Sequence, residues 1–121
     1  QWFQYHVDQL TRQSLRAQEA AFVQEHETDT NEQLLRYLRQ QAFSLGFTPN
    51  AQEIIGGKYI SFRFGGWRRA VTAARLQQPR GNPTLTKCRL YKNEFERQAK
   101  LFREERRQKY GGAAAGKENE V

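Results

Sequence analysis

The stretch GGKYISFRFGGWRRAVTAARL, from Gly56 to Leu76, alternates glycine pairs with short segments rich in aromatic and basic residues. The first segment, 58–64, also shows the alternation of a strand, but no partner strand is evident elsewhere to satisfy its backbone hydrogen bonds. We therefore expect a short helix over 58–64 that ends at the second glycine pair. A further helix is predicted from Trp67, because apolar residues recur there at helical spacing. They are Trp67, Ala70, Val71 and Ala74.

Two short helices joined by a glycine pair predict a sharp corner in the chain. We expect Trp67, Phe62 and Phe64 to fill a small core behind this corner, since packing is the commoner role of aromatic side chains at helical spacing. Arg68 and Arg69 would then project from a rigid surface, with little conformational freedom left to lose on binding a partner.

Hydrophobic periodicity in the rest of the chain predicts an all-α fold. We expect a small helical bundle in which a compact helix-turn-helix-like unit lies between long N- and C-terminal helices. The additional helices are expected at 2–26, 31–45, 49–54 and 87–110. The segment Gln77–Thr84 contains two prolines and is expected to be a linker.

Capping residues predict where several of these helices begin and end. Thr30 is the expected N-cap of the helix over 31–45, with Gln33 as its capping-box partner. Gly46 is the expected C-cap of the same helix. Thr48 is expected to cap the short helix over 49–54, with Pro49 in its first position, and Thr86 to cap the last helix.

Each long terminal helix carries an apolar stripe. The stripe of helix 2–26 is too short for a clear coiled-coil assignment, so we slightly favour packing within the chain over a dimer seam. It consists of Phe3, Val7, Leu10, Ser14, Ala17 and Ala21. The narrower stripe of helix 87–110 consists of Tyr91, Phe95, Leu101 and Phe102.

Charge is distributed unevenly along the chain. The formal net charge is +7, yet residues 1–33 carry −4 and residues 34–110 carry +12. A region this basic favours a polyanion as partner, nucleic acid first and an anionic membrane surface second. No apolar run reaches the ~18 residues that span a bilayer, and no secretory signal pattern is present. We expect a cytoplasmic protein, associated with the nucleoid in a bacterium, that does not bind membranes.

The sequence lacks the patterns that carry common catalytic or metal chemistry. It has no Walker-type loop, no serine nucleophile elbow and no paired acids in a cleft pattern. Cys88 is the single cysteine, which excludes an internal disulfide. His6 and His26 are expected to be surface or packing residues rather than metal ligands. We expect no enzymatic activity, no cofactor, no bound metal and no small-molecule substrate.

Three segments together resemble the repeat found beside HNH homing endonucleases. They are GFTP at Gly46–Pro49, Ile54, and RFGGWRRAVTAARL at Arg63–Leu76. The chain departs from the family pattern at Gly66, where serine is usual, and at Arg75, where a closing glycine is usual. The matching positions are Gly46, Thr48, Pro49, Phe64, Gly65, Trp67, Ala70, Ala73 or Ala74, and Leu76.

This resemblance implies a compact helical DNA-binding unit, here without the nuclease. With it, the chain divides into five expected parts. They are an acidic N-terminal helix at 1–30, the repeat-like unit at 31–76, a linker at 77–86, a basic C-terminal helix at 87–110 and a disordered tail at 111–121.

The helix over 58–64 is the candidate for entry into a groove of duplex DNA. Lys58, Ser61 and Arg63 are expected to face the DNA. Arg68 and Arg69 are expected on backbone phosphates, which position a protein on a duplex.

Three further residues complete the expected site. Gly66 would let a phosphate approach the following helix closely, and Arg36 and Arg39 would widen the footprint. The predicted function is a non-enzymatic protein that binds double-stranded DNA, a small regulator or accessory factor of phage or mobile-element type. The alternative is a helical protein-interaction module, including a homodimer through the N-terminal helix. RNA binding is a weaker alternative, because base-level RNA recognition needs exposed aromatic side chains and those of this chain are expected to be buried.

Overall fold

The computed structural model describes residues 2–110, and these residues form helices and no strands. The all-α prediction is therefore confirmed. The tail expected to be disordered, 111–121, lies outside the described residues. The elements in order are α1 (Trp2–His26), α2 (Asn31–Leu45), the 3-10 turn η1 (Ala51–Glu53), α3 (Gly57–Phe64), α4 (Trp67–Ala73), the 3-10 turn η2 (Leu85–Lys87) and α5 (Arg89–Tyr110).

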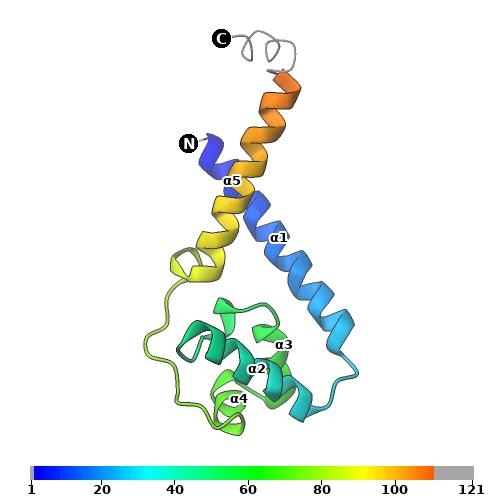
Figure 1. Cartoon of the computed structure of the whole chain (residues 1–121), viewed down its shortest axis with the longest axis vertical. Helices are drawn as coiled ribbons and strands as arrows, with labels where there is room; N and C mark the ends of the chain where they lie inside the picture. The colour runs from blue at the N-terminus through cyan, green and yellow to red at the C-terminus, as the bar shows by residue number, and fades with distance from the viewer. Residues whose placement is uncertain (1, 111–121) are drawn as a thin grey trace.

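The helices form two groups. Helices α1 and α5 run antiparallel and pack against each other, while α2, α3 and α4 form a compact group around the lower end of α1 (Figure 1). The N-terminal end of α1 and the C-terminal end of α5 lie together at the opposite end of the molecule. The group of α2, η1, α3 and α4 is called the repeat unit below.

A single hydrophobic core holds the repeat unit together and joins it to α1. Phe22 from α1 lies in this core beside residues of α2, α3 and α4. Trp67 is partly buried against it, and its indole N–H donates to the carbonyl oxygen of Pro49 at 3.0 Å. The other buried members are Leu34, Leu35, Leu38, Ile54, Ile60, Ala70 and Ala74.

Glycine is required where α3 packs on η1. A Cβ added to Gly57 would lie 1.9 Å from the carbonyl oxygen of Ala51, a distance that no side chain tolerates. The expectation for the aromatic side chains at the corner is partly wrong. Trp67 and Phe64 pack against the core, but Phe62 is 80% exposed. Phe62 lies two residues from Phe64, or about 200° around the helix, so the two cannot share a face.

The predicted caps hold for α2 and fail elsewhere. The Thr30 hydroxyl accepts from the N–H of Gln33 at 3.1 Å, and the Gln33 amide oxygen accepts from the N–H of Thr30 at 2.7 Å. Gly46 ends α2 with φ 85°. The expected helix over 49–54 is instead a 3-10 turn that begins after Asn50, whose N–H donates to the Glu53 carboxylate at 2.7 Å.

The last helix also begins later than expected. Thr86 lies inside η2 rather than capping α5, which starts at Arg89. Thr84 precedes η2, and the buried Cys88 links this turn to α5. The Pro-containing linker therefore ends in an ordered turn, and the Cys88 thiol that follows it lies 3.6 Å from the carbonyl oxygen of Gln52 in η1.

Polar contacts dominate the middle of the α1–α5 pair. The Ser14 hydroxyl donates to the Glu94 carboxylate at 2.6 Å, and the Tyr91 hydroxyl donates to Asp8. Burial raises the pKa of Tyr91 to about 12, and its bond to Asp8 adds to the shift. Burial also opposes ionisation of Glu94, but hydrogen bonds from Arg97, Gln98 and Ser14 outweigh it and lower the pKa of Glu94 to about 2.

Aromatic rings close the far end of the pair. Phe102 lies with its ring centroid 5.7 Å from Trp2 and 5.6 Å from Phe3. The upper part of the α1 stripe therefore packs within the chain, as preferred from the sequence. The prediction is wrong for the lower part of the stripe, because Ala17 and Ala21 are exposed.

The α5 stripe needs a similar correction. Leu101 is 46% exposed, whereas Glu94 and Ala99 are buried against α1. A carboxylate was not expected in this seam, because buried ionised groups are stable only when paired or hydrogen-bonded. Ser14, Arg97 and Gln98 satisfy that condition for Glu94.

Candidate nucleic-acid interface

One face of α3 points away from the core. Lys58, Ser61, Phe62 and Gly65 follow the spacing i, i+3, i+4 and i+7, which places them on a single helical face. All four are exposed or half-exposed, whereas Gly57 and Ile60 on the opposite face are buried. The four residues are called the outward face of α3 below.

The glycine pair at the end of α3 brings an arginine beside this face. Gly65 has φ 77° and Gly66 has φ 142°, both outside the range that other residues adopt easily. The Arg69 side chain from α4 lies along Gly65, with Nη1 3.3 Å from the position that a Cβ would take. No heavy atom lies within 4 Å of the corresponding position at Gly66, so this part of the corner is open.

Helix α1 fixes the start of α3. The Glu19 carboxylate accepts from the N–H of Gly56 at 2.7 Å and from the N–H of Tyr59 at 3.3 Å. It thereby acts as a capping group for α3, and a negative charge there suits the helix dipole. Gly56, at φ 91°, lies so close to Phe22 that an added Cβ would meet its ring at 2.5 Å. Sequence reasoning missed Glu19, because the contact spans 37 residues.

The repeat unit is strongly basic, and most of its cations have no internal partner. Residues 31–76 contain seven basic and two acidic residues. Both acids are used internally, since Glu32 pairs with Arg39 and Glu53 accepts from Asn50. Within residues 2–110, five of the seven basic side chains make no hydrogen bond, ion pair or ring contact. These five, called the unpaired cations below, are Arg36, Lys58, Arg68, Arg69 and Arg75.

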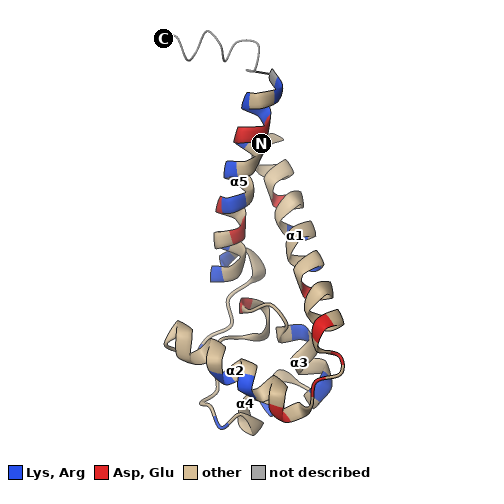
Figure 2. Cartoon of the chain, turned by 45° about the vertical axis from the view of Figure 1, so that its right-hand side comes forward, with Lys and Arg blue, Asp and Glu red and all other residues tan. Residues whose placement is uncertain are grey.

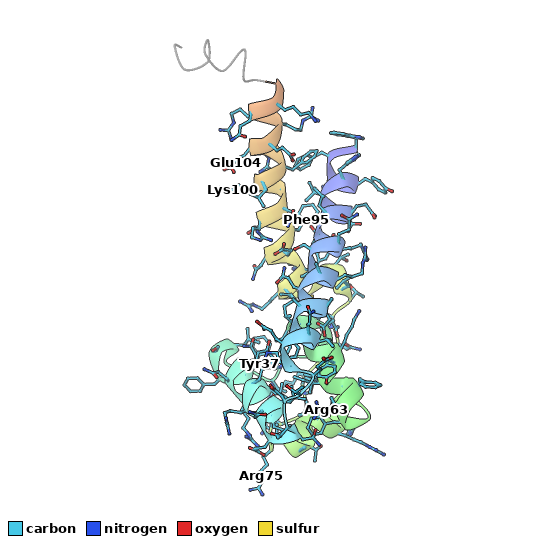
Figure 3. All side chains as sticks on the ribbon, turned by 90° about the vertical axis from the view of Figure 1, so that its right-hand side faces the viewer. Tyr37, Arg63, Arg75, Phe95, Lys100 and Glu104 are labelled. Carbon is cyan, nitrogen blue, oxygen red and sulfur yellow. The ribbon has the colours of Figure 1, made fainter. Side chains whose placement is uncertain are left out.

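Arg63 contacts other parts of the same chain. Its guanidinium donates to the Tyr59 hydroxyl at 3.1 Å, to the carbonyl oxygen of Asp29 at 2.9 Å and to Oδ1 of Asn31 at 2.6 Å. Figure 3 shows Arg63 at the lower end of the molecule, where α3 meets the connection between α1 and α2. Arg63 therefore ties this connection to α3 and does not share the outward face with Lys58 and Ser61.

Arg39 has a similar structural role. Its Nε donates to the carbonyl oxygen of Ala74 at 3.1 Å, which satisfies the C-terminal end of α4. Its Nη1 lies 3.1 Å from the Glu32 carboxylate. Arg36, one turn earlier on α2, is exposed and belongs to the unpaired cations. The structure thus places Lys58 and Ser61 on the outward face of α3 and Arg69 beside Gly65 at the end of that helix, while the guanidinium groups of Arg63 and Arg39 are engaged within the chain.

Arg75 occupies the position where the family pattern has glycine. It adopts φ 63°, the left-handed region that glycine favours. Its N–H donates to the carbonyl oxygen of Thr72 at 3.0 Å, and the N–H of Leu76 donates to that of Val71 at 3.1 Å. These two bonds terminate α4 as a glycine would, and the Arg75 side chain extends outward at the lower end of the molecule (Figure 3).

Lysine and arginine are distributed over both groups of helices, and acidic residues lie along α1 and its connection to α2 and also along α5 (Figure 2). No cluster of three or more His, Cys, Asp or Glu side chains that could hold a metal ion is present in the part of the chain that the structure describes. In the same residues, no helix is both long and apolar enough to cross a bilayer.

One comparison with known proteins gives a match. Residues 29–77, about two fifths of the 121 residues, match the family model of the homing endonuclease associated repeat. The matched segment covers α2, η1, α3 and α4, and so includes the outward face of α3 and all five unpaired cations. No curated protein and no solved structure matches the chain. The resemblance read from the sequence is confirmed over this segment.

Proposed function

We propose that this chain is a non-catalytic protein that binds duplex DNA through the corner formed by α3 and α4. The observation that carries this proposal is the set of unpaired cations. Arginine and lysine side chains on a folded protein often find carboxylates of the same chain, and here both acids of the repeat unit are already used. Five positive charges on one small unit therefore remain available to an external polyanion.

Counterion release supplies the driving force for such binding. Each phosphate that a lysine or arginine neutralises frees condensed cations from the duplex, and affinity becomes strongly dependent on salt. Lys58 belongs to the outward face of α3 and Arg69 lies beside its Gly65 end, while Arg68, Arg36 and Arg75 extend the basic surface over α4 and α2. These contacts position the protein but carry no sequence information by themselves.

The geometry of α3 suits entry into the major groove. An α-helix with its side chains is about 10–12 Å across, close to the width of the major groove and about twice that of the minor groove. Glu19 occupies the first N–H groups of α3, so the side chains of the outward face are what α3 offers to DNA. Because η1 and α1 both hold the start of α3, little ordering is left to occur on binding.

The two histidines support a role without catalysis. The ring of His26 stacks on Phe22 at 4.1 Å, and its Nδ1 lies 2.6 Å from Asp29. The ring of His6 lies 4.4 Å from that of Trp2 in the aromatic end of the α1–α5 pair. Both histidines thus take part in packing. The match to the homing endonuclease associated repeat supports an origin in a mobile element, with the chain as a regulator or accessory factor.

Fluorescence polarisation with labelled 20–30 bp duplexes of random sequence, measured over a salt series, tests this proposal. We expect binding at low salt that weakens steeply as salt rises, and weaker binding to single-stranded DNA and RNA hairpins. Binding that is absent at low salt, or equal for all three nucleic acids, would refute the assignment.

A homodimer through α1 is the second candidate, but only part of the apolar stripe of α1 is available for a dimer interface. Helix α5 of the same chain covers the Phe3 and Val7 end of that stripe, which leaves Ala17 and Ala21 as its exposed part. Light scattering after size exclusion, at several protein concentrations, separates a monomer from a dimer before any DNA is added.

A further inference from the structure

Phe62 is the exposed aromatic side chain of the outward face. It is 80% exposed, one turn after Lys58 and next to Ser61. Its only ring contact in the described part of the chain is with Tyr59, at a centroid distance of 6.5 Å. A large apolar side chain therefore stands in water on the same face as the groups proposed to meet DNA.

We propose that Phe62 contacts the C5 methyl group of a thymine in the major groove, and so makes binding dependent on sequence. This inference rests on the proposed function and adds a base contact to it. Of the four bases, thymine alone presents an apolar group at the major-groove edge, and phenylalanine is one of the side chains that meet it.

The position of Phe62 on α3 favours the major groove over a wedge between base pairs. Phe62 projects from the side of the helix, so it reaches a base only when α3 itself lies in the groove. The minor groove is about 6 Å wide and does not admit a helix, whereas the major groove is about 12 Å wide and does. Side chains that wedge between base pairs act from the minor groove, so the fit of α3 to the major groove favours a contact with a base edge.

The neighbours of Phe62 predict where the thymine lies relative to other contacts. Lys58 precedes Phe62 by four residues, or about 6 Å along the helix axis. Base pairs are about 3.4 Å apart, so a base reached by Lys58 lies about two base pairs from the thymine. The ammonium group of Lys58 is a donor suited to O6 and N7 of guanine. Ser61, beside Phe62, offers a hydroxyl to the intervening base pair.

The test replaces thymine by deoxyuridine, which removes the methyl group and leaves base pairing intact. Duplexes that the full chain enriches from a random pool would be sequenced and remade with deoxyuridine at one thymine position at a time. At one position we expect about a fourfold loss of affinity, the equivalent of one buried methyl group. Phe62→Ala should bind all these duplexes equally, about fourfold more weakly than the unsubstituted chain binds its site.

Phe43→Ala is the matched control, because Phe43 is 88% exposed but lies on α2, outside the outward face. Phe43→Ala should lose as much affinity as the unsubstituted chain when the thymine methyl is removed. Phe62→Leu retains an apolar side chain and should show part of this loss.

Three outcomes would overturn the inference. The first is enrichment of no sequence, the second is indifference to deoxyuridine at every position, and the third is the same methyl dependence in Phe62→Ala. Salt-sensitive duplex binding combined with any of these refutes the thymine contact alone. Loss of all duplex binding by the unsubstituted chain refutes the proposed function as well.

Discussion

The double variant Arg68→Ala, Arg69→Ala tests the interface most directly. Both side chains are exposed at the start of α4, and neither makes a hydrogen bond or ion pair within residues 2–110. Their removal should therefore change the free energy of unfolding by less than about 0.5 kcal/mol, the usual range for surface substitutions. Any large loss of DNA affinity would then come from lost contacts with DNA.

The expected size of the effect follows from the number of unpaired cations. Lys58 is proposed to reach a base edge, which leaves four of the five for phosphates. If each of these four neutralises one phosphate, the slope of log affinity against log salt is about −3.6. Removing two flattens this slope to about −1.8. Between roughly 50 and 200 mM salt, affinity should then fall about 150-fold for the unsubstituted chain and about 12-fold for the double variant.

The assay is the fluorescence-polarisation salt series on one duplex, with thermal denaturation of each variant beside it. Lys100→Ala, Arg107→Ala provides a control with the same loss of charge. Both control residues are exposed on α5, and the structure gives neither side chain a partner within 2–110. Figure 3 places Lys100 far from the repeat unit. The control should keep the steep slope.

Equal flattening of the slope in both double variants would refute the reasoning, because it would show that net charge rather than the corner controls binding. A drop of several degrees in the Tm of Arg68→Ala, Arg69→Ala would also refute it. In that case the two arginines would be structural, as Arg63 and Arg39 are.

Four further predictions concern the fold around this interface. Gly57→Ala should destabilise the protein by at least ~2 kcal/mol, since the new Cβ would lie 1.9 Å from the Ala51 carbonyl oxygen; an unchanged Tm would contradict the packing of α3 on η1. Trp67→Ala should lower the free energy of unfolding in urea by ~3 kcal/mol, because it removes core contacts and the hydrogen bond to the carbonyl oxygen of Pro49. A loss below ~1 kcal/mol would show that Trp67 is not part of the core. Arg75→Gly should raise stability by about 0.5–1 kcal/mol by relieving φ 63°, and a lower urea midpoint would contradict this. The pKa of Glu94 is lowered from 4.5 to about 2, so the ionised carboxylate stabilises the folded protein fully above pH 4.5, and this stabilisation is lost as the pH falls toward 2. The free energy of unfolding measured in urea should therefore fall by about 2 kcal/mol over this range. Glu94→Gln should show a smaller fall.

Local signals in the sequence were sufficient for most of the helices. The capping box of Thr30 and Gln33 and the C-cap at Gly46 act within one turn, and the structure contains each of them. The exposure of Phe62 could also have been read from the sequence. It lies two residues from both Ile60 and Phe64, which is about 200° around a helix, so a helix that buries those two must expose Phe62.

Long-range contacts explain what sequence reasoning could not supply. The role of Glu19 depends on α1 passing the start of α3, and no periodicity within α1 indicates this. Arg63 was expected to face the DNA as part of the helix that enters the groove, but its guanidinium donates instead to Asp29 and Asn31. Pairing of Ser14 with Glu94 likewise needs the register of two helices that are 80 residues apart in sequence.

The attachment of α1 to α3 has a mechanical consequence. Glu19 and Phe22 join the lower end of α1 to the start of α3, and α5 packs against the upper end of α1. The 25 residues of α1 extend about 37 Å, close to the ~35 Å of one turn of duplex DNA. If α3 enters a groove as proposed, a partner bound at the aromatic end of α1 would be held about one helical turn of DNA away from that groove.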